Sequence, residues 1–188
     1  MSGGDAGPPF RIVAERPAWS GRRIDVGEIE VEAPDGSRHE REVVHHPGAV
    51  GVVPLHDDGT VTLVRQYRAA VDGDLWEVPA GLRDVDGEPT AATAERELAE
   101  EAGLRAERLD HLVTFHNSPG FSDEELVVYE ATGLTEVPDD RQGIEEQHML
   151  VARVPLSEAL AMVDDGRITD AKTVIALLAV ARRRMSRG

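Results

Sequence analysis

The sequence predicts an α/β or α+β domain in which a mixed β-sheet is sandwiched between helices. Short apolar runs separated by turn residues recur along the 188 residues, and three segments have the apolar spacing of amphipathic helices. Hydrophobic residues make up 40% of the chain and charged residues 30%, which is enough apolar material for a substantial core. Because aromatic residues contribute only 4%, aliphatic side chains must form most of that core.

The composition excludes several classes of function. A net charge of −16 repels phosphate at long range, whereas a nucleic-acid binder needs a basic surface. The absence of cysteine excludes disulfides, thiolate zinc sites and cysteine nucleophiles. The sequence has no apolar run of membrane-spanning length and no secretory leader, so we expect a cytoplasmic protein without membrane association. If the substrate is a phosphate ester, clustered carboxylates must hold a divalent metal that neutralises it locally.

The N-terminal part of the chain predicts a small sheet. Residues 1–9 are rich in Gly and Pro and are expected to be disordered. Residues 10–46 contain short β-type runs, with a turn at residues 34–37, and predict a small antiparallel sheet. Such a sheet is too thin to be stable alone, so it should pack against the main domain, at residues 47–188, or against a second subunit.

The main domain opens with a predicted β-hairpin. The apolar runs at 50–55 and 60–67 are joined by the turn His56-Asp57-Asp58-Gly59. The remaining elements follow from the spacing of apolar residues. We expect strands at residues 75–80, 109–115, 125–132 and 148–154, and helices at residues 90–102, 157–165 and 170–185.

Residues at the helix ends support these boundaries. Gly103 supplies the C-terminal stop of the helix at 90–102. Thr169 is expected to cap the last helix, and Leu178 is expected on its apolar side. The basic residues 182–184 in its last turns suit the helix dipole, with a phosphate-binding patch as the other interpretation.

The helix at 90–102 carries an unusual set of carboxylates. Glu97 and Glu101 lie one turn apart on one face, with Glu100 beside them. Three like charges this close destabilise one another unless a cation is present. On the helix alone, two interpretations remain open, namely a solvated acidic face and a cation site.

The residues around this helix resemble a known family pattern. The segment GLRDVDGEPTAATAERELAEEAGL contains Glu88, then seven residues, then Arg-Glu-Leu-x-Glu-Glu-x-Gly-Leu from Arg96 to Leu104. This arrangement closely resembles the Nudix box, and the chain is similar to Nudix hydrolases, which implies the Nudix fold. It departs from the pattern in one respect, because six residues, and not five, separate Gly81 from Glu88.

The box makes physical sense as a metal site. The carboxylates of Glu97 and Glu101, with the backbone oxygen of Ala80, offer hard oxygen ligands that suit Mg²⁺ or Mn²⁺. Glu100 acts directly or through water. Metal ions bound there neutralise a diphosphate and activate a water, so no side-chain nucleophile is needed. The resemblance also implies an ion pair between Arg96 and Glu88 that holds the helix against its loop.

A general base is missing from the box itself. Similar enzymes often take it from a downstream loop, and the polar stretch RQGIEEQHM offers two glutamates. We favour Glu146 as both metal ligand and base for the attacking water, with Glu145 as the alternative. The third possibility is that both are ordinary loop carboxylates.

Further residues resemble ADP-ribose pyrophosphatases. Pro119 and Gly120 lie in NSPGFSDE, with Pro119 sixteen residues beyond Gly103. In that subfamily, Arg68 of LVRQYR and Arg41 match substrate arginines, although each can also have a structural role. The resemblance implies hydrolysis of ADP-ribose to AMP and ribose 5-phosphate, by a homodimer whose shared N-terminal sheet lets Arg41 serve the partner's site. The alternatives are another nucleoside diphosphate sugar or nucleotide as substrate, or a non-catalytic Nudix-fold binding protein.

Overall fold

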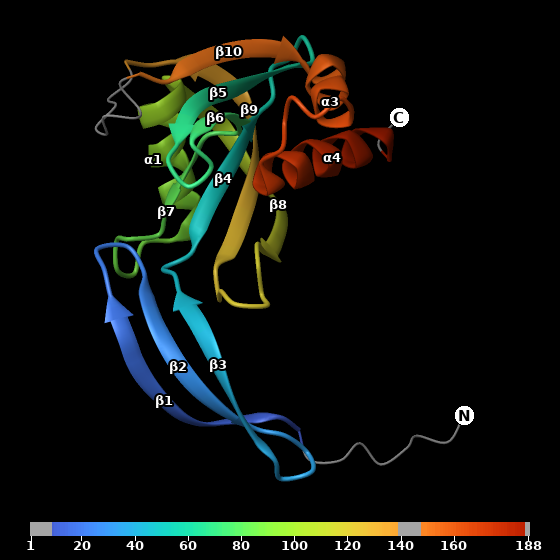
Figure 1. Ribbon diagram of the computed structural model, residues 1–188. Coiled ribbons are helices and arrows are strands. Elements are labelled where there is room, and N and C mark those ends of the chain that lie inside the picture. Colours follow the sequence, from blue (N-terminus) through green and yellow to red (C-terminus); the bar gives the residue numbers. More distant parts are fainter. Residues whose placement is uncertain (1–8, 139–147, 187–188) are drawn as a thin grey trace. The chain divides into compact units, whose positions relative to one another are not determined.

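The computed structural model describes residues 9–138 and 148–186 (Figure 1). Contacts within the chain divide it into two compact units. Unit 1 comprises Met1–Pro47 together with Ser118–Glu124, and unit 2 comprises Gly48–Asn117 together with Glu125–Gly188. The loop at 118–124 therefore groups with the N-terminal sheet, although it lies far from that sheet in the sequence.

Unit 1 is built on a three-stranded antiparallel sheet. Its strands are β1 (Arg11–Ser20), β2 (Asp25–Glu32) and β3 (Arg38–His45), in the order β1-β2-β3. The turn between β2 and β3 has Gly36 at a φ of 83°, in the left-handed region that a residue without Cβ adopts readily. The small antiparallel sheet and its turn at residues 34–37 are thus confirmed.

Unit 2 contains two sheets and three helices among its described residues. The first sheet has the order β7-β4-β9-β8, with β4 and β9 parallel and the other pairs antiparallel. The second is antiparallel, with the order β10-β5-β6. The strands are β4 (Ala49–Pro54), β5 (Thr60–Arg68), β6 (Gly73–Glu77), β7 (Ala80–Leu82), β8 (Leu104–His116), β9 (Glu125–Glu136) and β10 (Leu150–Pro155), and the helices are α1 (Thr90–Ala102), α3 (Leu156–Asp164) and α4 (Ala171–Met185).

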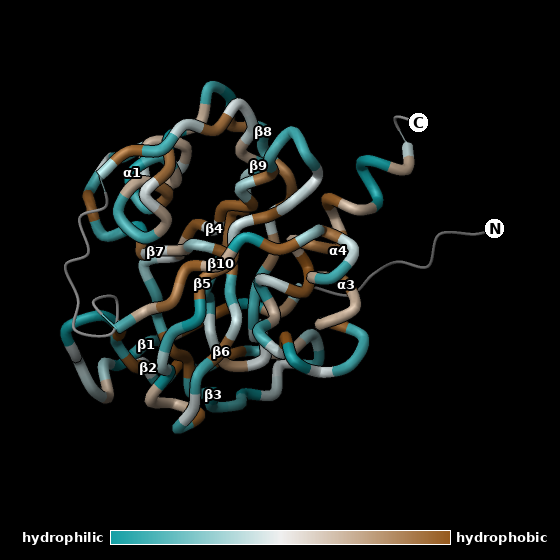
Figure 2. The backbone as a smooth tube through the Cα atoms, turned by 90° about the horizontal axis from the view of Figure 1, so that it is seen from above, coloured by the Kyte–Doolittle hydropathy of each residue, from teal (hydrophilic) through white to brown (hydrophobic). Residues whose placement is uncertain are grey.

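Alternation along the central strands gives unit 2 a core on each face of its mixed sheet. In β4, Val50 and Val52 belong to a cluster with Leu98 of α1, whereas Val53 belongs to a cluster with Leu177 of α4. This is the expected result for a strand buried on both faces, since successive side chains point in opposite directions. Figure 1 shows α1 and α4 on either side of β4, and Figure 2 shows β4 largely hydrophobic in colour. The predicted mixed sheet between helices is confirmed.

The prediction of one continuous strand at residues 75–80 is wrong, because this segment forms two strands that belong to different sheets. β6 ends at Glu77 and β7 begins at Ala80. Pro79 lies between them and has no N–H to donate to a sheet partner, while its carbonyl accepts a hydrogen bond from the N–H of Val52 at 2.9 Å. The chain passes from one sheet to the other at this point, directly before the box.

The last helix, α4, differs from expectation in its N-cap residue and in the exposure of Leu178, which was expected on its apolar side. The N-cap is Asp170, not Thr169, and its carboxylate accepts a hydrogen bond from the N–H of Thr173 at 3.0 Å. Leu178 is 51% exposed, whereas Leu177 is fully buried.

Among the described residues, no helix combines the length and the apolar character that a membrane crossing requires.

Candidate active site

Helix α1 places the box glutamates as the sequence predicts. It spans Thr90–Ala102 and ends at Gly103, which has a φ of 62° and donates its N–H to the carbonyl of Ala99. Glu97 and Glu101 lie on the buried face of this helix, with 8% and 4% of their surface exposed. Buried carboxylates are costly unless they are paired or hydrogen-bonded, so the partners of these two residues decide what the face can do.

Arg96 supplies positive charge to the carboxylates of the box. Its Nη1 lies 2.6 Å from Glu97 Oε1 and 3.2 Å from Glu100 Oε2, and its Nη2 lies 3.6 Å from Glu88 Oε2. Although burial acts in the opposite direction, the charges of these glutamates hold the pKa of Arg96 above its ordinary value. The expected contact with Glu88 is present, but Arg96 also contacts three further carboxylates, the third being Asp84 at 4.0 Å. One guanidinium among four carboxylates leaves this cluster negatively charged.

The backbone at the start of β7 contacts both buried carboxylates. The N–H of Ala80 donates to Glu101 Oε2 at 2.9 Å. At Gly81, a Cβ atom would overlap the carboxylate of Glu97, so a side chain at this position would displace that carboxylate. The loop between Gly81 and Glu88 contains a turn, in which the N–H of Glu88 donates to the carbonyl of Val85 at 3.1 Å and Gly87 has a φ of 73°.

The donors at this site fit a hard divalent cation. They are the carboxylate oxygens of Glu97 and Glu101, which lie beside the backbone of Ala80 and Gly81. Among the described residues, no group of three His, Asp or Glu side chains is close enough to hold a metal by itself. A cation at this site therefore needs the backbone oxygen, water or substrate to complete its coordination, which is normal for Mg²⁺.

Gly81→Ala tests whether the contact between Gly81 and Glu97 matters for metal binding. The flexible end of the Glu97 side chain can move aside, so the free energy of unfolding without metal should change by less than about 1 kcal/mol. Its carboxylate would then be misplaced, and we expect metal affinity to fall by about 10- to 100-fold, as for changes in residues that orient metal ligands. Titration calorimetry with Mn²⁺ measures this.

Gly73→Ala is the matched control, because a Cβ at Gly73 meets nothing closer than 3.8 Å. Equal metal affinities for the two variants would show that the space at Gly81 is not required for metal binding.

Arg68 lies in unit 2, on a buried glutamate that the sequence analysis missed. Its Nε and Nη2 donate to the two carboxylate oxygens of Glu77, at 2.7 Å and 2.6 Å. Glu77 is fully buried, whereas 40% of the Arg68 side chain is exposed. The hydrogen bond to Glu77 is the main cause that holds the pKa of Arg68 above its ordinary value. The charges of Glu77 and Glu101 also raise this pKa, whereas burial lowers it. Arg68 therefore lies within the electrostatic field of the box.

Lys172 is the second cation on Glu77. Its Nζ contacts Glu77 Oε2 and lies 3.0 Å from Asp170 Oδ2. Two features of the sequence could have indicated this cluster. Glu77 is a charged residue inside the apolar run LWEVPA, and Lys172 is the single lysine among 20 Lys and Arg residues.

The other predicted substrate residues belong to unit 1. Arg41 lies on β3, donates to the carbonyl of Glu40 at 2.7 Å and lines a hollow of about 270 Å³. Pro119 and Gly120 lie in the loop Ser118–Glu124 of the same unit. The predicted substrate residues are thus divided between the two units, with Arg68 in unit 2. Glu145 and Glu146 lie outside the described residues.

The loop that carries Pro119 is fastened to the end of β3. The N–H of Val44 donates to the carbonyl of Phe121 at 2.7 Å. His45 Nδ1 lies 2.7 Å from Asp123 Oδ2, and His45 Nε2 lies 3.1 Å from Glu15 Oε1. The hydrogen bond to Asp123 is the main cause that holds the pKa of His45 above its ordinary value. The imidazole of His45, between the carboxylates of Asp123 and Glu15, therefore joins this loop to the sheet.

We expect this contact to depend on pH. Because the pKa of His45 is raised on folding, its stabilisation is complete below the unfolded value of about 6.5 and is lost as pH rises through the higher folded value. Asp123→Asn should lower the pKa of His45, which NMR titration of the imidazole signals measures. His56 is an internal comparison, because burial lowers its pKa. An unchanged His45 titration in the variant would contradict the assignment of Asp123 as the main cause.

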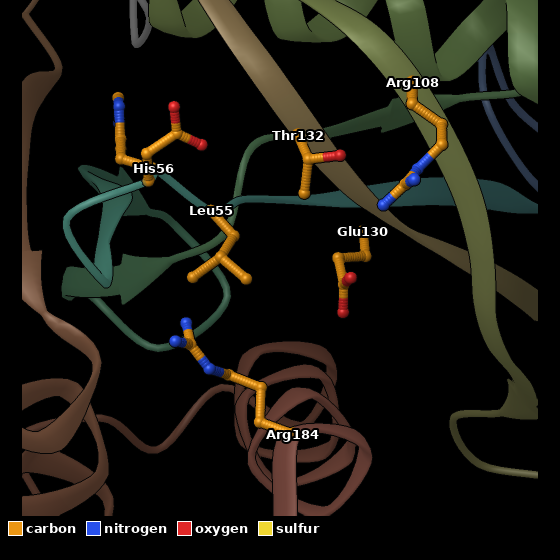
Figure 3. A pocket seen from close by; sticks show the side chains of 7 residues that line it. Leu55, His56, Arg108, Glu130, Thr132 and Arg184 are labelled. Carbon is orange, nitrogen blue, oxygen red and sulfur yellow. The ribbon is translucent and has the colours of Figure 1, made fainter. Parts of the chain in front are cut away.

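A separate hollow of about 400 Å³ lies elsewhere in unit 2, and Figure 3 shows the side chains that line it. Arg108 and Arg184 line it together with Glu130, so it has mixed charge and does not suit a diphosphate. The neighbouring Arg183 donates to the carbonyl of His111 at 2.7 Å and lies 3.8 Å from Glu130. This basic end of α4 thus contacts the neighbouring strands, which favours a structural role over a phosphate-binding patch.

Known proteins share both the sequence pattern and the fold. A family profile described as NUDIX domain matches residues 45–177. The ADP-ribose pyrophosphatase of Mycobacterium tuberculosis is 41% identical over 171 residues, covering 91% of this chain and 83% of that protein. The ADP-ribose pyrophosphatase of Bacillus subtilis is 37% identical over 167 residues, covering 89% and 90%. The crystal structure of an ADP compounds hydrolase aligns with a TM-score of 0.83 over 97% of this chain and 98% of that chain, at 24% identity, a likeness that shows the fold.

Proposed function

The chain belongs to the NUDIX domain family, and we propose that it hydrolyses the diphosphate linkage of ADP-ribose to AMP and ribose 5-phosphate. Membership confirms the resemblance inferred from the box. The observation that carries the reaction type is the pair of buried carboxylates, Glu97 and Glu101, beside the backbone of Ala80 and Gly81. The names of the two bacterial relatives support the substrate, together with the resemblance of the loop around Pro119.

We propose Mg²⁺, or Mn²⁺, as the cofactor, held by Glu97, Glu101 and the carbonyl of Ala80, with Glu146 as a further ligand. When bound, such a metal neutralises the diphosphate, orients it and lowers the pKa of a coordinated water. The oxygen donors and the net negative charge of the cluster around Arg96 support a cation at this place.

The protein's own residues have separate roles in this proposal. Arg96 orients Glu97 and Glu100 and ties them to Glu88. Glu100 contributes directly or through water. Glu146 accepts the proton of the attacking water as the general base, with Glu145 as the alternative. As the water loses this proton, its oxygen bonds to one phosphorus, the bond from that phosphorus to the bridging oxygen breaks, and the other product leaves with the bridging oxygen on its phosphate.

Substrate binding is proposed for Arg68, Arg41, Pro119 and Gly120. Arg68 would bind the diphosphate, because its guanidinium is held by Glu77 and still partly exposed. Arg41 would serve the site of a partner in a homodimer that shares the N-terminal sheet. Support for such a dimer comes from β1, an edge strand along which large hydrophobic side chains are exposed. These exposed side chains are Ile12 and Trp19 of β1 and Phe10, which directly precedes it. The cytoplasmic location stays a prediction of the sequence.

A substrate panel tests the function. The purified protein is assayed with Mg²⁺ and with Mn²⁺ on ADP-ribose, other nucleoside diphosphate sugars and nucleoside triphosphates, with products identified by chromatography. We expect ADP-ribose to have the highest kcat/KM and to give AMP. Equal or faster turnover of another sugar nucleotide would instead assign that substrate. Absence of metal-dependent turnover at high protein concentration would favour a binding protein.

A further inference from the structure

We propose that Lys172 is a positioning residue for Arg68, which it holds through Glu77 toward the diphosphate of the substrate. This inference rests on the proposed function, because it assumes that Arg68 binds that diphosphate. Lys172 lies at the start of α4, in a segment to which the sequence analysis gave no role in catalysis.

The carboxylate of Glu77 binds both Arg68 and Lys172. Both of its carboxylate oxygens accept hydrogen bonds from one edge of the Arg68 guanidinium, and Lys172 Nζ contacts Oε2 from α4. The planar fork of the arginine and a flat carboxylate fix each other's orientation. Any movement of Glu77 must therefore turn Arg68 with it.

Lys172 fixes the position of Glu77 from the side of α4. It is 8% exposed and also lies 3.0 Å from Asp170, the residue that caps α4. A compact ammonium with three donors can bind two carboxylates in a confined space, which a larger planar guanidinium does less well. The chain has one lysine and otherwise uses arginine, and that lysine is at this buried position.

The same turn of α4 also holds the backbone that leads to the box. The N–H of Val78 donates to Thr173 Oγ1 at 2.9 Å, and Thr173 Oγ1 donates to Asp170 Oδ2 at 2.6 Å. Two residues after Val78, the N–H of Ala80 donates to Glu101. The start of α4 and the buried face of α1 thus bind the two ends of the segment from Val78 to Ala80. This segment directly follows Glu77 and leads to the backbone proposed to bind metal.

Charge balance distinguishes this cluster from a simple structural ion pair. Buried ion pairs contribute little net stability relative to apolar residues of the same volume. Here, two cations and two carboxylates lie together, with Arg68 on β5, Glu77 on β6, and Asp170 and Lys172 at the start of α4. The outermost cation, Arg68, keeps 40% of its side chain exposed. An arginine that is clamped on one edge and exposed on another is prepared for an anionic ligand.

Lys172→Met is the decisive variant, because methionine has a similar length and flexibility without the charge. We expect KM for ADP-ribose to rise by about tenfold or more, as a misplaced binding group predicts, with kcat within about threefold of wild type. Val180→Ala is the matched control, since Val180 is a fully buried residue of α4 outside the cluster. It should lower the melting temperature and leave KM unchanged. Lys172→Arg, which keeps the charge if Met does not fold, should raise KM less.

A double-mutant cycle tests whether Lys172 acts through Arg68. In an Arg68→Met background, adding Lys172→Met should raise KM no further, because the group that it positions is gone. Additive effects, or an unchanged KM in the single variants, would overturn the proposal. The single lysine provides a readout that does not depend on activity. In protein labelled with ¹⁵N-lysine, the one side-chain signal should shift on Glu77→Gln and, in wild type, on addition of AMP.

The two proposals fail in different ways. If wild-type protein does not hydrolyse ADP-ribose, the proposed function fails, and the panel identifies another substrate on which the same variants are measured. If wild type hydrolyses ADP-ribose but Lys172→Met keeps its KM and AMP leaves the lysine signal unmoved, only the positioning role of Lys172 is overturned.

Discussion

Glu101→Gln is expected to lower kcat/KM for ADP-ribose by about 10³-fold, which corresponds to about 4 kcal/mol of transition-state stabilisation. Glutamine keeps an oxygen that can accept the hydrogen bond from the N–H of Ala80, so the contact between helix and strand survives. It removes the negative charge that a divalent cation requires of a ligand. Steady-state rates at saturating Mg²⁺, with Mn²⁺ affinity by calorimetry, measure the change.

Stability without metal separates this explanation from simple unfolding. We expect the free energy of unfolding of metal-free Glu101→Gln to stay within about 1 kcal/mol of wild type. Glu97→Gln should not gain stability from lower repulsion, because Arg96 already binds that carboxylate at 2.6 Å. Glu95→Gln is the matched control, since Glu95 is an exposed carboxylate of the same helix. A large loss of metal-free stability, or a loss of activity in the control, would contradict the metal role.

Glu146→Gln is expected to lower kcat by about 10²- to 10⁴-fold, the range for removal of a general base. The amide cannot accept the proton of the attacking water. Because the base acts on the bound substrate, KM should change far less than kcat. Single-turnover rates with excess enzyme measure the chemical step directly.

Glu145→Gln is the comparison that decides between neighbouring residues. If Glu146 is the base, Glu145→Gln keeps a kcat within about threefold of wild type, since a carboxylate without a role in proton transfer contributes little to the rate. The reverse pattern would move the role to Glu145. Two variants near the wild-type rate would show that both are ordinary loop carboxylates.

The sequence by itself determined the local features of this protein. Helix α1 has the predicted bounds Thr90–Ala102, because its apolar spacing and the stop at Gly103 act within one helical turn. The antiparallel sheet of unit 1 also follows from short apolar runs and turn residues. The hairpin predicted from residues 50–55 and 60–67 is wrong, because β4 and β5 belong to different sheets and share only an isolated bridge between Leu55 and Val61. The family pattern from Glu88 to Leu104 identified the box because its residues are fixed on one helix and the loop before it.

The tertiary structure alone decided what surrounds the box. Glu77 and Lys172 are 95 residues apart in the sequence, and no local periodicity relates a strand end to the first turn of a distant helix. The contact between the Glu97 carboxylate and Gly81 depends on how α1 packs against β7. The division of the segment around Pro79 into two strands depends on which sheet each strand joins. Local patterns fix helices, strands and turns over a few residues. The pairing of buried charges depends instead on which elements the hydrophobic cores bring together, and that is a property of the whole fold.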